Sequence, residues 1–95
     1  MKQKFDISTF VNVTTEENTL KGIVDRVKLR RKELKLTQKE LSKRSGVSYG
    51  SIRRFESIGE ISLTSLLKIA TAINCLEDFK DLFKYSQITN LKDYK

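Results

Sequence analysis

The sequence predicts an all-α fold of five helices, preceded by a short N-terminal segment whose apolar residues suggest extended structure. Apolar residues recur at helical spacing in separate blocks, glycine or a Ser/Thr cap separates these blocks, and proline is absent. A chain of 95 residues can form one small domain around one core. We divide it into an N-terminal segment (1–15), a helical domain (16–84) and a C-terminal tail (85–95).

The first predicted helix follows the cap at Thr14 and Thr15 and runs to about Lys35. Acidic side chains occupy its first turn, where they interact favourably with the helix dipole. Its apolar stripe is formed by Leu20, Ile23, Val24, Val27 and Leu34. Arg31 lies in the middle of this stripe, so a charged side chain occupies a predicted core position.

Caps mark the second and third helices. Thr37 and Glu40 form a capping box that starts a short second helix. Gly46 supplies the left-handed residue that ends this helix. Ser48 then caps a third helix, which we place at 48–57.

Two more helices are expected in the second half of the chain. Ser62 caps a fourth helix whose apolar residues repeat at helical spacing up to Ile73, and Asn74 is the expected stop. A fifth short helix is expected to close the core. Its apolar residues are Leu76, Phe79, Leu82 and Phe83. The tail at 85–95 has no clear pattern.

The composition excludes several classes of protein. The chain has no histidine and a single cysteine, Cys75, so it lacks an internal disulfide, a His-containing zinc site and a histidine-assisted nucleophile. We therefore expect no enzyme, no metal and no cofactor, and we interpret Cys75 as a small buried hydrophobic residue. No apolar run reaches the roughly 18 residues of a membrane span, and no signal peptide is recognisable, so we expect a cytoplasmic protein.

The positive charge lies in the middle third of the chain. The whole sequence has a net charge of +7. Residues 21–54 contain twelve basic and three acidic side chains, a net charge of +9, whereas 1–20 and 55–95 each carry −1. A basic stretch of this kind either binds a polyanion or only solvates the exposed faces of helices. Charge alone does not separate these two interpretations.

The stretch from Gln38 to Ser57 satisfies the stereochemical requirements of a helix-turn-helix. Two helices that meet at about a right angle need apolar anchors, a small residue at their crossing and a glycine in the turn. The small residue is Ser42 and the glycine is Gly46. The anchors are Leu41, Val47, Ile52 and Phe55.

This region resembles the Xre/Cro-repressor-like helix-turn-helix family. The resemblance is carried by RRKELKLTQKELSKRSGVSYGSIRRFE and SLTSLLKIATAI, and it extends over residues 20–83. It implies a lambda-repressor-like fold and a DNA-binding function. The chain departs from the family pattern at Ser42, where alanine is usual, and over Ser57 to Gly59, where a glycine directly after the glutamate is common.

Arg31 and Glu56 are expected to form a structural ion pair. Arg31 lies on the apolar stripe of the first helix, and a buried guanidinium must be paired. Glu56 lies within about 40° of Ile52 around the third helix, so it faces the same edge of the core. The alternative is that Arg31 reaches past the apolar residues into solvent.

The third helix would enter the major groove with its N-terminus first. The resemblance places base-reading positions at Tyr49, Gly50 and Arg54, and phosphate or supporting contacts at Gln38 and Ser48. Arginine can bind guanine O6 and N7 with two hydrogen bonds, and Arg54 is our first choice for that role. The full set of predicted DNA contacts is Gln38, Lys43, Ser48, Tyr49, Gly50, Ser51, Arg53 and Arg54.

Several of these residues keep a second interpretation. Arg53 can reach either a base or a phosphate. Gly50 either lets the backbone approach the groove or is tolerated in the first turn, although glycine costs about 1 kcal/mol relative to alanine inside a helix. Tyr49 either contacts DNA or covers the turn. Backbone N–H groups around Gln38 suit a phosphate oxygen, because a helix N-terminus offers unpaired donors.

Some apolar residues have no place in the predicted core. They are Phe5, Phe10, Val13 and Leu29. Such residues mark a partner surface, or the N-terminal segment covers them within the same chain. The resemblance implies a homodimer on a two-fold operator whose half-sites lie roughly 34 Å apart. We expect its interface in the fourth and fifth helices or in the N-terminal segment.

The function expected from these observations is sequence-specific binding of double-stranded DNA by a transcriptional repressor. One alternative is a HipB-like antitoxin, which represses its own operon and also binds a toxin. Another alternative is an interaction adaptor that has kept the fold without reading DNA. None of these functions involves a membrane.

Overall fold

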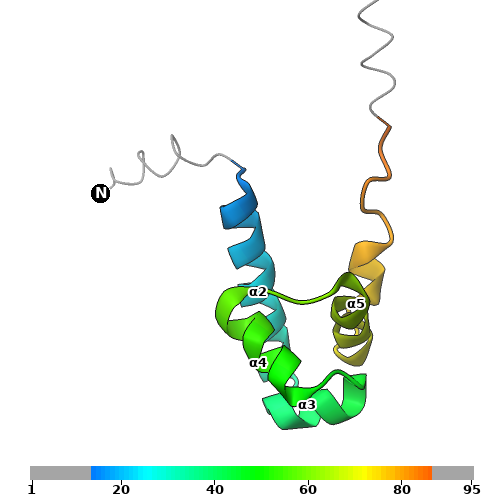
Figure 1. Ribbon diagram of the computed structural model, residues 1–95. Coiled ribbons are helices and arrows are strands. Elements are labelled where there is room, and N and C mark those ends of the chain that lie inside the picture. Colours follow the sequence, from blue (N-terminus) through cyan, green and yellow to red (C-terminus); the bar gives the residue numbers. More distant parts are fainter. Residues whose placement is uncertain (1–13, 87–95) are drawn as a thin grey trace, which may run out of the picture.

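The computed structural model describes residues 14–86, and this part of the chain is all-helical, as predicted (Figure 1). Four α-helices are followed by one short 3₁₀ helix within the described residues. These elements are α2 (Glu16–Glu33), α3 (Gln38–Ser45), α4 (Tyr49–Ile58), α5 (Leu63–Ala72) and η1 (Leu76–Phe79). The extended structure predicted near the N-terminus and the surplus residues Phe5, Phe10 and Val13 lie outside the described residues.

A side-chain oxygen caps the start of each α-helix in this part of the chain. In every case a Thr or Ser accepts a hydrogen bond from the backbone N–H three residues later, which satisfies one of the donors that a helix leaves unpaired. The capping residues are Thr15, Thr37, Ser48 and Ser62. The capping box is complete, because the Thr37 N–H donates to Glu40 Oε1 at 2.8 Å.

Each α-helix in the described part of the chain is ended by a left-handed residue, which is glycine in two cases and another residue in the other two. Gly46 and Gly59 end α3 and α4 in the left-handed conformation, with φ angles of 78° and 80°. Lys35 and Asn74 have the same left-handed conformation after α2 and α5, although neither is glycine. Both belong to Schellman motifs, in which two backbone N–H groups bond back to carbonyls of the last turn. Asn74 is therefore the stop that the sequence predicts.

The core lies where α3, α4 and α5 meet. The largest fully buried side chains are Leu41, Ile52, Phe55, Ile69 and Ile73. Val47 is buried beneath the turn, and the Ser42 hydroxyl donates to the Val47 carbonyl oxygen at 2.6 Å. The small residue at the helix crossing thus also holds the turn closed. All four predicted anchors of the helix-turn-helix are buried, which confirms that part of the prediction.

The predicted fifth helix is present only in part, and it is not an α-helix. Only Leu76–Phe79 is helical there, as a 3₁₀ turn, and Cys75 at its start makes no side-chain capping bond. A helix this short is marginal without a cap, so the chain turns away after four residues. Leu76, Leu82 and Phe83 do not close the core, since all three are exposed and Phe83 is 99% exposed.

Three smaller expectations about burial also need correction. Leu20 and Leu34 belong to the predicted apolar stripe, yet both are exposed because they lie near the ends of α2, beyond the packed middle of the helix. Cys75 is half-buried against the core rather than fully enclosed.

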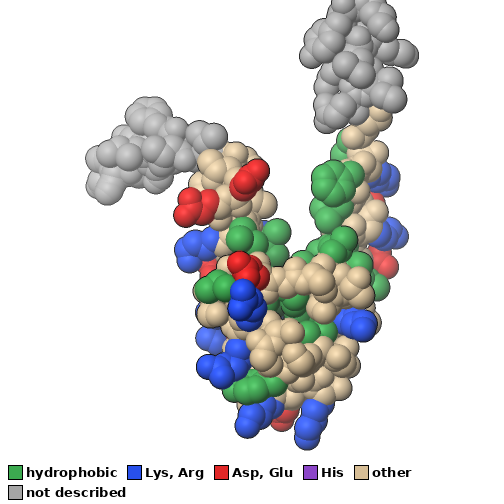
Figure 2. Space-filling view, viewed as in Figure 1, with side chains coloured by type: hydrophobic (Ala, Val, Ile, Leu, Met, Phe, Trp, Pro, Cys, Tyr) green, Lys and Arg blue, Asp and Glu red, His purple; other side chains and the backbone are tan. Residues whose placement is uncertain are grey.

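The helices are arranged as two diverging arms on a common base (Figure 1). One arm is the N-terminal part of α2, and the other is formed by α5 and η1. Helix α3 packs on both α4 and α5, while α2 packs on α4. Lys and Arg side chains gather around the base formed by α3 and α4 (Figure 2).

Candidate nucleic-acid interface

Helix α4 has a buried side and an exposed side. Ile52, Phe55 and Glu56 are buried, whereas Gly50, Arg53 and Arg54 are exposed. At 3.6 residues per turn these two sets fall on opposite sides of the helix. The outer side can therefore make contacts without disturbing the core.

An open, polar depression of about 640 Å³ lies between α2 and α4. Lys28 of α2 lines it together with Arg53 and Arg54 of α4, so three cations surround the opening. The buried Arg31 and Glu56 also line it. Such a depression attracts an anionic group, because three cations line it and only Arg54 among them has an acidic partner, Glu60, within ion-pair distance in the described part of the chain.

The expected Arg31–Glu56 ion pair is present, and it is bidentate. Arg31 Nε donates to Glu56 Oε2 at 2.8 Å, and Arg31 Nη2 donates to Glu56 Oε1 at 2.9 Å. The third nitrogen, Nη1, donates to the Leu36 carbonyl oxygen at 2.8 Å. Gln38 Nε2 adds a further bond to Glu56 Oε1 at 2.9 Å. This network joins α2, the loop after it, α3 and α4.

The environment of Glu56 keeps its carboxylate ionised. Burial alone would raise the pKa of Glu56, but the hydrogen bonds from Arg31 and Gln38 outweigh burial and hold its pKa below the ordinary value. A buried carboxylate without these donors would be costly. The negative charge of Glu56 is thus balanced by Arg31 within the network, so it contributes little to the electrostatic potential of the outer surface.

Gln38 has a role that sequence reasoning missed. The resemblance implies that Gln38 holds phosphate or supports the base contacts, whereas in the structure its side-chain amide donates to Glu56. Gln38 is the first residue of α3, so its backbone N–H still lies at the helix N-terminus. The capping box fixes where α3 begins, but the position of Gln38 beside Glu56 follows from the packing of α3 on α4, for which the sequence carries no local signal.

The ring of Tyr49 contacts two cations. Lys39 Nζ is 5.4 Å from the centre of its ring, and the Arg53 guanidinium carbon is 5.6 Å from it. Both distances are in the range of a cation–π contact. Tyr49 therefore links α3 to α4 on the outer surface while its side chain stays partly exposed.

The remaining predicted contacts lie on the same outer surface. The Ser48 hydroxyl accepts the Ser51 N–H at 3.1 Å and donates to the Ser51 hydroxyl at 2.8 Å, so both serines stabilise the start of α4. Lys43 is exposed in the last turn of α3. Arg54 is exposed as expected, but it forms an ion pair with Glu60 that the sequence did not predict.

Two packed helices joined by a tight turn, with a basic outer side, define the class of DNA-binding helix-turn-helix domains. The helix-turn-helix family model HTH_3 matches residues 27–80, which is more than half of the chain. The protein belongs to this family, which is of the Xre/lambda-repressor-like type. Searches of curated proteins and of solved structures gave no match.

Membership of this family makes the chain a DNA-binding regulator of transcription. The family is not typically enzymatic. Between residues 14 and 86, no helix combines the length and apolar character that crossing a membrane requires.

Proposed function

We propose that the protein represses transcription by binding a specific operator in double-stranded DNA with α4 in the major groove. The observation that carries this proposal is the outer side of α4, where Gly50, Arg53 and Arg54 are exposed beside a basic depression. A major groove admits one α-helix, and arginine is the side chain best suited to reading guanine. Occupation of promoter DNA would then block transcription.

The proposed contacts divide into base contacts and phosphate contacts. Arg54 reads guanine, Tyr49 contacts a thymine methyl group or a phosphate, and Gly50 lets the backbone approach the groove. Phosphate oxygens are bound by exposed cations and by the backbone N–H groups at the start of α3. The residues assigned to phosphate or supporting contacts are Gln38, Lys43, Ser48, Ser51 and Arg53.

A double variant tests this proposal against the adaptor alternative. Duplexes selected from a random pool supply the specific DNA. Arg53→Ala combined with Arg54→Ala should abolish measurable specific binding and leave the unfolding midpoint nearly unchanged, because both side chains are exposed. Lys68→Ala combined with Lys84→Ala removes the same charge from exposed positions in α5 and after η1, away from the outer side of α4, and serves as the control. An adaptor would keep its biological activity in the first variant.

We also propose that the protein binds DNA as a homodimer. The outer side of α5 and η1 carries an apolar groove of about 320 Å³. Its apolar lining residues are Leu63, Leu67, Leu76, Phe79, Leu82 and Phe83. A contiguous exposed apolar surface of this kind is typical of an interface. Leu63→Lys combined with Leu76→Lys should convert the dimer to a monomer in sedimentation equilibrium, whereas a monomeric wild type would refute the dimer.

A HipB-like antitoxin is a second candidate, and one observation favours it. A second apolar groove of about 340 Å³ lies between α2 and the arm formed by α5 and η1. It shares Phe79 and Leu82 with the proposed dimer interface, but its α2 side lies beyond that interface and is open to a protein. Co-purification with the product of a neighbouring gene would support the antitoxin. A simple repressor would purify alone.

A further inference from the structure

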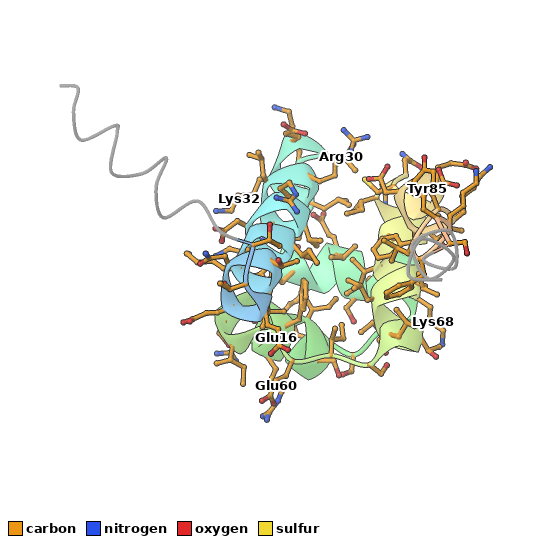
Figure 3. All side chains as sticks on the ribbon, turned by 90° about the horizontal axis from the view of Figure 1, so that it is seen from above. Glu16, Arg30, Lys32, Glu60, Lys68 and Tyr85 are labelled. Carbon is orange, nitrogen blue, oxygen red and sulfur yellow. The ribbon has the colours of Figure 1, made fainter. Side chains whose placement is uncertain are left out.

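We infer that Glu60 contributes to the sequence specificity of DNA binding, because it positions the guanidinium of Arg54. This inference rests on the proposed function. Arg54 Nε donates to Glu60 Oε1 at 3.0 Å, and Arg54 Nη2 donates to the same oxygen. Figure 3 shows Glu60 at the outer edge of the molecule, away from Lys68 and Tyr85 on the α5 side.

The geometry of the pair leaves one edge of the guanidinium available. Glu60 occupies the edge formed by Nε and Nη2 of Arg54. Among residues 14–86, Arg54 Nη1 forms no hydrogen bond. A bidentate contact to guanine O6 and N7 needs two N–H groups from one edge, and the Nη1–Nη2 edge can supply them. Glu60 can therefore hold the plane of the guanidinium while Arg54 binds a base.

The backbone holds Glu60 in place for this role. Gly59 ends α4 in the left-handed conformation, and its N–H donates to the Phe55 carbonyl oxygen at 2.8 Å. A Cβ at Gly59 would lie 3.0 Å from the Leu20 side chain, so the turn packs closely on α2. Ile61, on the other side of Glu60, packs against the core. Fixed neighbours on both sides direct Glu60 toward Arg54.

The charge of Glu60 acts differently on specific and on non-specific DNA. A carboxylate beside the DNA-binding surface repels every phosphate backbone, whatever the base sequence. Ordering of Arg54, by contrast, helps only where a guanine accepts its hydrogen bonds, because less side-chain freedom is then lost on binding. Glu60 should thus weaken non-specific binding and strengthen discrimination. Replacing a residue that merely stabilised the fold would change neither the affinity for non-specific DNA nor the ratio of specific to non-specific affinity.

Glu60→Gln tests this inference, with Glu33→Gln as the matched control. Glu33 is an exposed acid paired with Arg30 on α2, so its replacement makes the same charge change away from α4. Binding is measured by fluorescence anisotropy on the selected duplex and on a duplex in which its guanine is replaced. Glu60→Gln should raise affinity for the replaced duplex about two- to fivefold. It should lower the ratio of the two affinities about two- to tenfold.

The outcomes separate this inference from the proposed function. A wild-type protein without any sequence preference would overturn both. Normal discrimination by the wild type with an unchanged or increased ratio in Glu60→Gln would overturn the role of Glu60 and leave the proposed function standing. Arg54→Ala provides the final check: adding Glu60→Gln to it should not lower the ratio further, since no guanidinium remains to be positioned. A further loss in the double variant would also contradict the role.

Discussion

Within residues 14–86, two arginine–glutamate pairs involve α4, one on its inner side and one on its outer side. Arg31–Glu56 lies on the inner side, where the two side chains are 10% and 4% exposed. Arg54–Glu60 lies on the outer side, where they are 62% and 61% exposed. Both pairs use the Nε and Nη2 nitrogens of the arginine. The two pairs differ in environment and also in geometry, since Arg31 bonds both carboxylate oxygens of Glu56 whereas Arg54 bonds one oxygen of Glu60.

Burial decides what each pair can do. Breaking a buried pair by removing one partner leaves an unpaired charge without water, at a cost of about 3 to 5 kcal/mol, whereas an exposed pair contributes about 0 to 1 kcal/mol. The inner pair is closed off by further bonds from Gln38 and to Leu36, so it holds helices together. The outer pair is open to a ligand, so the same residue types can serve recognition.

The largest effect is expected from breaking the inner pair. Glu56→Gln should lower the free energy of unfolding by about 3 to 5 kcal/mol, because the Arg31 guanidinium is left buried without its carboxylate. Glu60→Gln, the same change in the outer pair, should lower it by about 1 kcal/mol or less. Urea unfolding of both variants measures the difference. Equal effects would contradict the contrast between the two pairs.

The pH dependence of stability sharpens the same comparison. The pKa of Glu56 is held below its ordinary value in the folded protein, so its contribution is complete above the unfolded pKa of about 4.3. The contribution is lost as the pH falls through the folded pKa. Urea unfolding between pH 6 and pH 3 should therefore show a loss of wild-type stability that is smaller in Glu56→Gln. Parallel curves for the two proteins would mean that Glu56 does not titrate in this way.

Removing the arginine of the outer pair should affect recognition rather than stability. Arg54→Ala should reduce discrimination for the base that it reads by about 1 to 3 kcal/mol, or about 5- to 150-fold. The free energy of unfolding should change by only about 0.5 kcal/mol, since Arg54 is exposed. Binding to single-base variants of the selected duplex, together with urea unfolding, measures both quantities. A large loss of stability would place Arg54 among the structural residues instead.

Gly50→Ala tests the outer side of α4 without changing its charge. Nothing lies within 4 Å of an added Cβ, so the free protein should tolerate the methyl group and gain up to about 1 kcal/mol of stability from helix propensity. DNA affinity should fall, because the methyl group would separate the backbone from the groove. Thermal unfolding and anisotropy are measured on the same samples. Unchanged affinity would favour simple tolerance of glycine in the first turn.

The smallest effect is expected at a phosphate contact. Lys43→Ala should weaken binding to all duplexes alike and make the slope of log K against log salt shallower by about 0.9. Its specificity ratio should stay at the wild-type value. A salt titration on specific and non-specific duplexes separates this behaviour from that of Arg54→Ala. Loss of specificity in Lys43→Ala would instead assign this lysine to base reading.

Local chemistry made most of the fold predictable. The spacing of Thr37 and Glu40 is that of a capping box, which depends only on neighbouring residues and predicts the start of α3. Gly46 predicts its end, because few other residues accept the left-handed conformation. Arg31 could be paired with Glu56 because both lie on apolar stripes of their helices. The fifth helix is shorter than its apolar spacing predicts, because no side chain caps its start.

Contacts across a loop were not predictable in the same way. Glu60 lies outside any periodic pattern, and its contact with Arg54 depends on the turn at Gly59 and on how two long exposed side chains orient. The bond from Gln38 to Glu56 likewise depends on the packing of α3 against α4. The periodicity of a sequence fixes which side of a helix a residue occupies, but not which partner it finds there.

The central claim, that the outer side of α4 reads a specific sequence, is tested most directly by selection from random duplex DNA at one fixed salt concentration. Wild type and Arg54→Ala are selected in parallel. The account predicts a two-fold symmetric consensus for the wild type, with a guanine whose preference alone is lost in Arg54→Ala. Recovery of no consensus with the wild type would contradict the claim.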